Sequence, residues 1–230
     1  MNLTMEAIRP QLDDFLERLL ALWPGRLLFF GLQGSWRRGE ATPESDVDLV
    51  VVLDRLLPGD PARYRELAAA APFGREACGF LCGRSELEAW PRYDLLQLYQ
   101  DTFALFGSLD ALTGPFTAAD AREAARTGAA NLYHAALHSY LYDPAHAKAA
   151  ALPVLLKSMF FVLRSAQFAR SGRCAPSKAA LLSELAGEER ELLSASLQPD
   201  PLPKDGGGID PLLLGLVQQC SLLLNEFGPR

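Results

Sequence analysis

Two aspartates stand two positions apart just before an apolar run: Asp46 and Asp48 lead into LVVVL, residues 49–53. Side chains two apart on an extended strand point to the same side, so the two carboxylates can converge. Close carboxylates repel each other, and a bound divalent cation removes that repulsion. Oxygen ligands, with positions open for phosphate and water, are what Mg²⁺ prefers. The pair therefore indicates a site for one or two Mg²⁺ ions, with a metal-independent polar strand entry as the simpler alternative.

The residues that precede this pair are suited to binding phosphate. Gly34 and Ser35 follow a short apolar segment, and a glycine there lets the backbone approach a ligand closely. Exposed backbone N–H groups and the Ser35 hydroxyl can hold phosphate oxygens. Arg37 and Arg38 come next, and their guanidinium groups suit phosphate. A strand, a Gly-Ser pair and an aspartate pair ahead of a buried strand are together more specific than any one of them.

The stretch F-x-G-L-Q-G-S…S-D-V-D-L-V-V-V resembles the signature of the nucleotidyltransferase superfamily that shares the DNA polymerase β fold, in its minimal and aminoglycoside-modifying branches. The resemblance implies that Asp46 and Asp48 are catalytic and hold Mg²⁺. It also implies that Gly34 and Ser35 bind a nucleoside triphosphate, with Arg37 or Arg38 holding phosphate.

The superfamily normally adds a third carboxylate on a neighbouring strand. Glu76 is the first choice here, because it opens the short apolar run EACGFLC one strand later. Asp94 and Asp101, in RYDLLQLYQDTFALFG, are the alternatives, and all three could instead be surface charges.

The second half of the chain is similar in places to the helical domain of streptomycin and spectinomycin adenylyltransferases. The segment LLKSMFFVLRSAQFARSGRCAPSKAALLSEL carries the resemblance, which spans most of residues 27–185. It places Ser177 and Lys178 at a turn after a long helix and implies that Lys178 contacts nucleotide phosphates. The alternative is a lysine in the first turn of an exposed helix.

Hydrophobic periodicity predicts a mixed α/β first half and a helical second half. Together with the resemblance, this implies an α+β protein with a mixed sheet in an N-terminal domain, residues 1–113, and a helical bundle in residues 114–230. The expected strands are 27–31, 49–53 and 77–81, with 94–99 ambiguous between strand and helix. The expected helices are 5–22, 60–70, one starting after a Thr117 cap, 147–171, one capped by Ser177, and 211–227. Residues 199–210 are expected to form a loop.

Composition excludes several classes of function. The net charge is −6, with no basic face or tail evident, so a general nucleic-acid binder is not expected. The sequence shows neither a secretion signal nor an uninterrupted apolar stretch long enough to span a membrane, and its 4 cysteines are expected to be reduced in the cytoplasm. No Walker A, dinucleotide-binding or nucleophile-elbow motif occurs.

The sequence therefore predicts an Mg²⁺-dependent nucleotidyltransferase. It is expected to move a nucleoside monophosphate, AMP from ATP in the first instance, to a hydroxyl of a small-molecule acceptor. Two alternatives stay open: a nucleotide-binding or regulatory module with weak catalysis, and an antitoxin-type enzyme that modifies a partner protein.

Overall fold

The structure is a computed structural model that describes residues 4–71, 73, 77–197, 203 and 206–229. The chain divides after Pro115 into two compact units. Each unit has its own hydrophobic core, one built around a sheet and the other around long helices.

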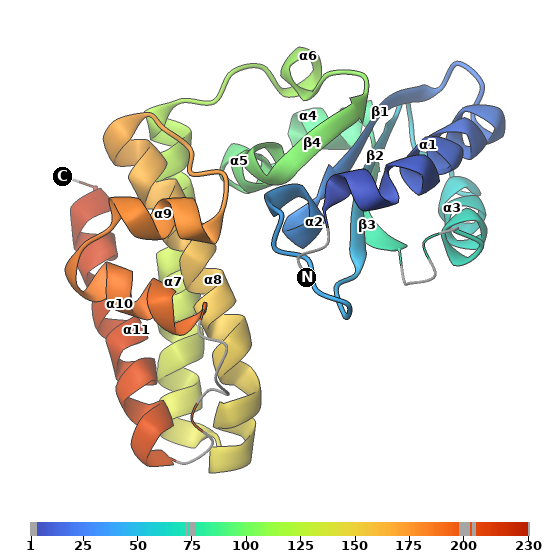
Figure 1. The fold of residues 1–230 in the computed structure, drawn as a ribbon. Coiled ribbons are helices and arrows are strands. Elements are labelled where there is room, and N and C mark those ends of the chain that lie inside the picture. Colours follow the sequence, from blue (N-terminus) through green and yellow to red (C-terminus); the bar gives the residue numbers. More distant parts are fainter. Residues whose placement is uncertain (1–3, 72, 74–76, 198–202, 204–205, 230) are drawn as a thin grey trace. The chain divides into compact units, whose positions relative to one another are not determined.

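The N-terminal unit is built on a four-stranded sheet (Figure 1). Its strands are β1 (Leu27–Gln33), β2 (Val47–Leu53), β3 (Ala77–Gly83) and β4 (Thr102–Phe106), in the order β3-β2-β1-β4. β2 runs parallel to β3 and antiparallel to β1, and β4 is antiparallel to β1. The predicted mixed sheet is thus confirmed.

β2 is a central strand covered on both faces. Leu49 to Leu53 are fully buried, as their continuous apolar pattern predicts. Val47, Leu49, Val51 and Leu53 pack with the apolar side of α1 (Met5–Leu22). The alternate residues Val50 and Val52 face the other side, where α4 (Arg84–Ala89) contacts the sheet. The strand is therefore a rigid support for the residues at its start.

Four further helices complete this unit: α2 (Gly34–Arg38), α3 (Asp60–Ala69), α5 (Arg92–Asp101) and α6 (Leu109–Thr113). Predicted helices at 5–22 and 60–70 are present as α1 and α3. The ambiguous segment 94–99 is helical, within α5. Helices α2, α4 and α6 and strand β4 were not expected from the sequence.

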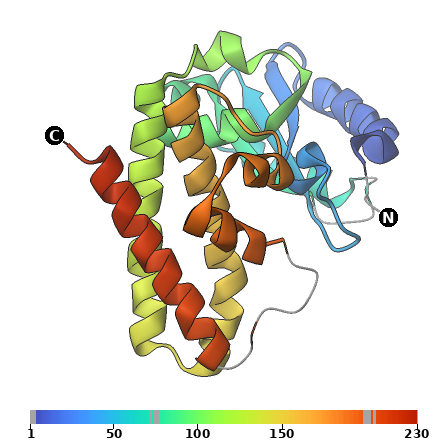
Figure 2. The same ribbon diagram turned by 60° about the vertical axis from the view of Figure 1, so that its left-hand side comes forward.

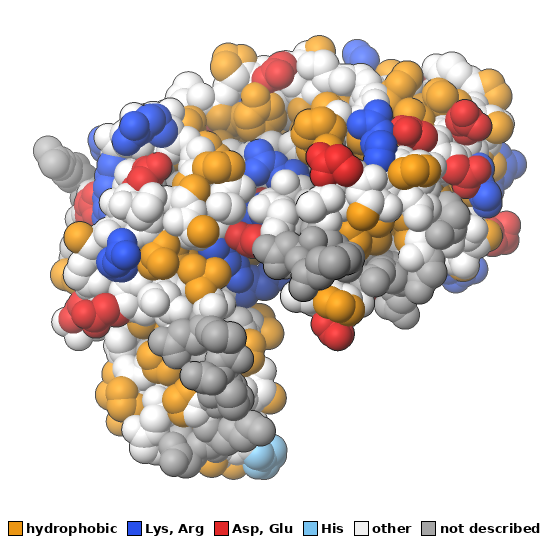
Figure 3. Space-filling model, in the orientation of Figure 1, with side chains coloured by type: hydrophobic (Ala, Val, Ile, Leu, Met, Phe, Trp, Pro, Cys, Tyr) orange, Lys and Arg blue, Asp and Glu red, His pale blue; other side chains and the backbone are white. Residues whose placement is uncertain are grey.

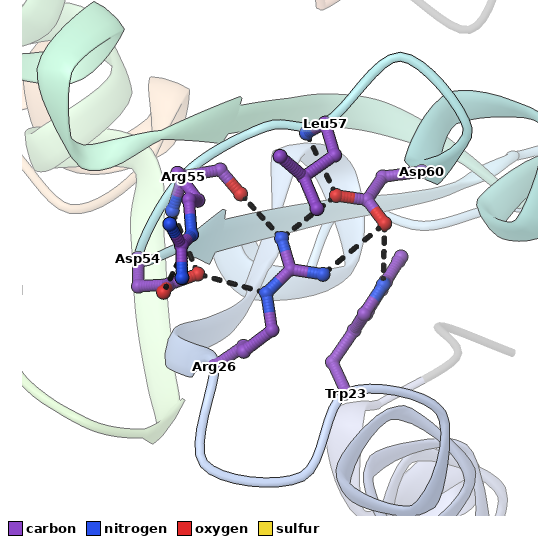
Figure 4. Close-up of polar contacts among 6 residues, drawn as sticks. All are labelled: Trp23, Arg26, Asp54, Arg55, Leu57 and Asp60. Atoms are coloured by element: carbon purple, nitrogen blue, oxygen red, sulfur yellow. Dashed lines mark hydrogen bonds and ion pairs between the residues drawn. The ribbon is translucent and has the colours of Figure 1, made fainter.

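A buried polar cluster joins several of these elements at the end of β2 (Figure 4). The Asp60 carboxylate, 2% exposed, accepts hydrogen bonds from Trp23 Nε1 at 2.9 Å, from the Leu57 N–H at 2.8 Å and from Arg26. Arg26 also donates to Asp54 at 3.0 Å. The cluster ties the end of α1 and the start of β1 to the loop that leads into α3.

The C-terminal unit is helical. Three long helices lie side by side (Figures 1 and 2): α7 (Ala118–Tyr142), α8 (Ala145–Ser171) and α11 (Gly206–Phe227). Two short helices, α9 (Lys178–Glu184) and α10 (Gly187–Ala195), pack with them. Thr117 and Asp120 form the capping box of α7, and Ser177 caps α9, both at the predicted positions.

Some predictions for this unit need correction. α10 was not expected, and α11 begins at Gly206 instead of Pro211, so Gly206 to Asp210, predicted as loop, are helical. The rest of the predicted loop lies mostly outside the described residues. Pro211 is the sixth residue of α11, so it lies inside the helix, where its missing N–H leaves one i→i−4 hydrogen bond unmade.

Helices α8 and α11 are long and apolar enough, by length and composition, to cross a membrane. Both helices carry charged residues, so neither is an uninterrupted apolar stretch. Core helices of soluble bundles meet the same criterion, and both helices contribute apolar residues to the core cluster of this unit. More than half of the most apolar 18-residue segment of α8 is buried inside the unit. Packing within the unit therefore accounts for the apolar character of α8.

Candidate active site

Asp48 is the second residue of β2, and it is held between two neighbouring strands. The sheet register pairs it with Gln33 of β1 and with Cys78 of β3. Gly34, which follows Gln33, has φ +78°, and a Cβ there would collide with Oδ2 of Asp48. The Cys78 thiol donates a hydrogen bond to Oδ1 of Asp48 at 2.8 Å. The Asp48 carboxylate thus lies between Cys78 on one side and position 34 on the other, where only glycine fits.

Asp46 is placed differently from the sequence expectation. It is exposed and precedes the first residue of β2, Val47, so only Asp48 lies on the strand itself. No group of three or more His, Cys, Asp or Glu side chains that could hold a metal ion occurs among the described residues. Mg²⁺ does not require one, because it is commonly held by one or two carboxylates together with substrate phosphates and water. The oxygen donors of Asp46 and Asp48 fit that mode of binding.

The Gly-Ser pair opens a helix of five residues, α2 (Gly34–Arg38). Ser35 and Arg37 are partly buried and lie in the first turns of this helix. Arg38 has a different role from the predicted phosphate contact. Its side chain is 5% exposed and donates to Glu40 at 2.8 Å and to Asp101 at 2.5 Å.

Burial opposes the charge on Arg38, but the carboxylates of Asp101 and Glu40 more than offset it and raise the pKa of the guanidinium. Of the two arginines, Arg37 is thus the better candidate for holding phosphate, since Arg38 is engaged in a buried ion pair.

The three candidates for a third carboxylate are now distinguished in part. Glu76, the first choice, lies outside the described residues. Asp94 is exposed in the first turn of α5 and accepts a hydrogen bond from Trp90 Nε1 at 2.6 Å. Asp101 ends α5, is 3% exposed and is paired with Arg38. The buried pairing of Asp101 is that of a structural ion pair.

In the helical unit, Lys178 is the first residue of α9, directly after the Ser177 cap. Its Nζ lies 6.0 Å from the centroid of the Phe160 ring. The guanidinium of Arg164 lies 5.0 Å from the same ring and 5.2 Å from that of Phe161, within the range of cation–π attraction. Two cations thus lie at one aromatic ring.

Sequence reasoning missed Arg164, although a signal for it is present. Arg164 lies among buried apolar residues of α8, with Leu163 and Ala166 close by in the chain, and is itself only 1% exposed. Arginine is rarely buried so fully without a specific reason. A charge at a core position of a helical pattern is thus the feature that could have drawn attention to it.

On the face drawn in Figure 3, acidic and basic side chains are interspersed. This distribution agrees with the net charge of −6 and with a site that uses a few local cations.

Comparison with known proteins agrees with this geometry. Residues 12–82 match the nucleotidyltransferase domain family, and this segment contains Gly34, Ser35, Asp46 and Asp48. No curated protein sequence shows significant similarity to the chain.

Among solved structures, the fold is similar to that of spectinomycin adenyltransferase AAD(9) from Enterococcus faecialis, solved with ATP and spectinomycin. The TM-score is 0.60 at 14% sequence identity, and the match covers 92% of this chain and 99% of that one. This likeness extends to both units. Residues 12–82, in the N-terminal unit, thus match a nucleotidyltransferase domain, and the fold resembles that of spectinomycin adenyltransferase AAD(9).

Proposed function

We propose that this protein is a Mg²⁺-dependent adenylyltransferase that moves AMP from ATP to a hydroxyl group of a small-molecule acceptor. The observation that carries the proposal is the position of Asp48. The carboxylate of Asp48, just before the fully buried residues Leu49 to Leu53 of the central strand, stands directly against a glycine with φ +78°, at a place where any side chain would collide with it. A glycine beside the carboxylate lets the backbone approach a ligand closely, and Mg²⁺ is commonly held by one or two carboxylates together with substrate phosphates.

Each residue has a part in this mechanism. Asp46 and Asp48 would hold one or two Mg²⁺ ions, which when bound would neutralise charge developing on the transferred nucleotidyl group and the leaving pyrophosphate. Gly34 and Ser35 hold phosphate oxygens through the backbone and the hydroxyl, and Arg37 adds a positive charge. Glu76 is the proposed third acid, which takes the proton of the acceptor hydroxyl.

Lys178 is proposed to contribute to binding of the triphosphate. Its Nζ lies 6.0 Å from the centroid of the Phe160 ring, at the start of α9. The proposal for Lys178 is also what the resemblance of its segment implies.

The small-molecule acceptor is supported by the fold. The similar structure AAD(9) was solved with ATP and spectinomycin, and the match spans nearly all of both chains. Incubation with radiolabelled ATP and a panel of aminoglycosides, alongside a cell lysate, tests the acceptor class. Label on a small molecule supports the proposal, and label on a polypeptide supports the alternative of a protein acceptor.

The variant Asp48→Asn tests the mechanism. It keeps the shape of the side chain and removes its charge, so we expect pyrophosphate release in the presence of ATP, Mg²⁺ and acceptor to fall by about 10³-fold or more while circular dichroism is unchanged. Asp13→Asn is the matched control, because Asp13 is an exposed carboxylate on α1 that has no proposed part in the site. Undiminished transfer by Asp48→Asn would show the mechanism to be wrong.

A further inference from the structure

The contact between Cys78 and Asp48 has a consequence for the proposed site. The thiol of Cys78, an exposed residue of β3, donates to Oδ1 of Asp48 at 2.8 Å. The two residues are paired in the parallel register of β2 and β3, which runs without interruption from Val47↔Ala77 to Leu53↔Gly83. The contact is therefore fixed by the sheet and does not depend on a loop.

The residue after Cys78 shows why the strands come so close at this point. Gly79 has φ +140°, and a Cβ there would collide with the backbone carbonyl oxygen of Leu49. Only glycine lets β3 lie this close to β2 beside Asp48. A local backbone feature thus brings the thiol to the carboxylate.

The two oxygens of Asp48 then have different neighbours. Oδ1 accepts the hydrogen bond from Cys78, and Oδ2 faces the Cα of Gly34. A carboxylate with one oxygen held by a donor has fewer orientations open to it. Carboxylates that bind metal ions are commonly held in this way by an outer hydrogen bond.

We propose that Cys78 is a positioning residue for Asp48: its thiol holds Oδ1 so that the carboxylate is oriented for the divalent cation. This inference rests on the proposed function, in which Asp48 binds that cation. It assigns to β3 a thiol contact at Asp48 in addition to any third carboxylate. It also makes the site sensitive to chemical modification of a single cysteine.

Two variants separate positioning from packing. Cys78→Ser keeps a hydrogen-bond donor at this place, and Cys78→Ala removes it. We expect Cys78→Ala to weaken Mn²⁺ binding and to lower kcat, each about 10-fold to 100-fold. Mn²⁺ binding is measured by electron paramagnetic resonance in the absence of nucleotide. The KM for ATP should change little, and Cys78→Ser should stay within about threefold of wild type in both measurements, because it restores the donor.

Thiol labelling supplies a second measurement that needs no variant. Cys78 and Cys174 are exposed, while Cys82 and Cys220 are buried, and burial raises the pKa of both buried thiols to about 12. Iodoacetamide followed by peptide mass spectrometry should therefore label Cys78 and Cys174. ATP with Mg²⁺ should slow labelling of Cys78 and leave Cys174 unchanged, and alkylation of Cys78 should abolish transfer. The variant Cys174→Ser should have full activity before treatment with iodoacetamide. After treatment, and after removal of excess reagent, it should keep that activity only where Cys78 is not alkylated.

The outcomes distinguish this inference from the proposed function. If Asp48→Asn abolishes transfer but Cys78→Ala matches Cys78→Ser in Mn²⁺ affinity and kcat, the positioning role is wrong and the proposed function stands. If Cys78→Ala fails to fold, equal labelling of Cys78 with and without ATP and Mg²⁺ overturns the positioning role. Undiminished transfer by Asp48→Asn overturns the proposed function itself.

Discussion

At the scale of single residues, the contacts of Asp101 account for its charge without a catalytic role. Asp101 neutralises Arg38 in a pair whose two side chains are each 5% exposed. A buried pair of this kind stabilises the fold only while both partners are charged, because a lone buried charge is costly. Asp101 is therefore explained by the ion pair and does not need a catalytic role.

This explanation makes a prediction for Asp101→Asn. Removing one charge of the buried pair should lower the free energy of unfolding by about 1–3 kcal/mol, because Arg38 is left buried with Glu40 as its remaining charged partner. Urea denaturation measures the change, and transfer should persist when it is assayed well below the new midpoint. If stability is unchanged and transfer is lost, Asp101 is the third acid and the structural interpretation is wrong.

Lys178 allows a second prediction at this scale. Lys178→Ala should raise the KM for ATP about 10-fold, the effect of losing one charge-assisted contact to phosphate, with a smaller change in kcat. Lys157→Ala is the matched control, since Lys157 is an exposed lysine of the neighbouring helix α8. Equal KM values for the two variants would leave Lys178 with a purely structural role in the first turn of α9.

At the scale of elements, the Asp60 cluster connects α1, β1, β2 and α3 (Figure 4). The hydrogen bond from Arg26, opposed by burial and aided by those from Leu57 and Trp23, lowers the pKa of Asp60 from an ordinary value of 3.8 to about 2. A carboxyl group whose pKa is lower in the folded state than in the unfolded state stabilises the protein at pH values above the unfolded-state pKa. This stabilisation is lost as the pH falls through the folded-state pKa.

The cluster should therefore weaken between about pH 4 and pH 2, the interval set by the two pKa values of Asp60. Asp60→Asn should lower the free energy of unfolding at pH 7 by about 3 kcal/mol and flatten the loss of stability below pH 4. Urea midpoints measured from pH 2.5 to 7 give both quantities. Parallel pH profiles for Asp60→Asn and wild type would contradict this account.

The elements that could be predicted are those with a long or distinct pattern. The apolar periodicity of α1, the continuous apolar run of β2 and the cap residues of α7 and α9 each act locally, so the sequence carries them. α2, α4 and α6 have five or six residues, too few for a helical period to show. β4 follows α5 without a turn residue between them and is paired along one edge only, with β1, so its sequence lacks both usual signals.

At the scale of the whole molecule, the candidate site combines residues that the sequence reveals with contacts that only the fold creates. Gly34, Ser35, Asp46 and Asp48 lie close together in the chain and could be predicted from residue types and spacing. The Asp48–Cys78 contact spans 30 residues and depends on the register of β2 and β3, and the Arg38–Asp101 pair spans 63. Partners brought together by strand pairing leave no local pattern, so these could not be predicted.

The apolar helices α8 and α11 give a prediction for the whole molecule. Leu152, Leu156, Met159 and Phe160 of α8 and Leu213, Leu216 and Leu223 of α11 are buried in one core cluster. Transferring these helices to a bilayer would require this core to be opened, and the apolar area already removed from water would gain nothing further from lipid.

The folded chain should therefore stay with the aqueous fraction when it is floated with vesicles of neutral or anionic phospholipid. A variant that loosens the core, Phe160→Ala, is expected to lose about 3–5 kcal/mol of stability and provides the positive control. Because its helices open more readily, it should partition to vesicles on mild heating at a temperature where wild type does not. Flotation of the folded wild type would instead show that α8 or α11 enters the bilayer, and the bundle core would then be one of two states of this unit.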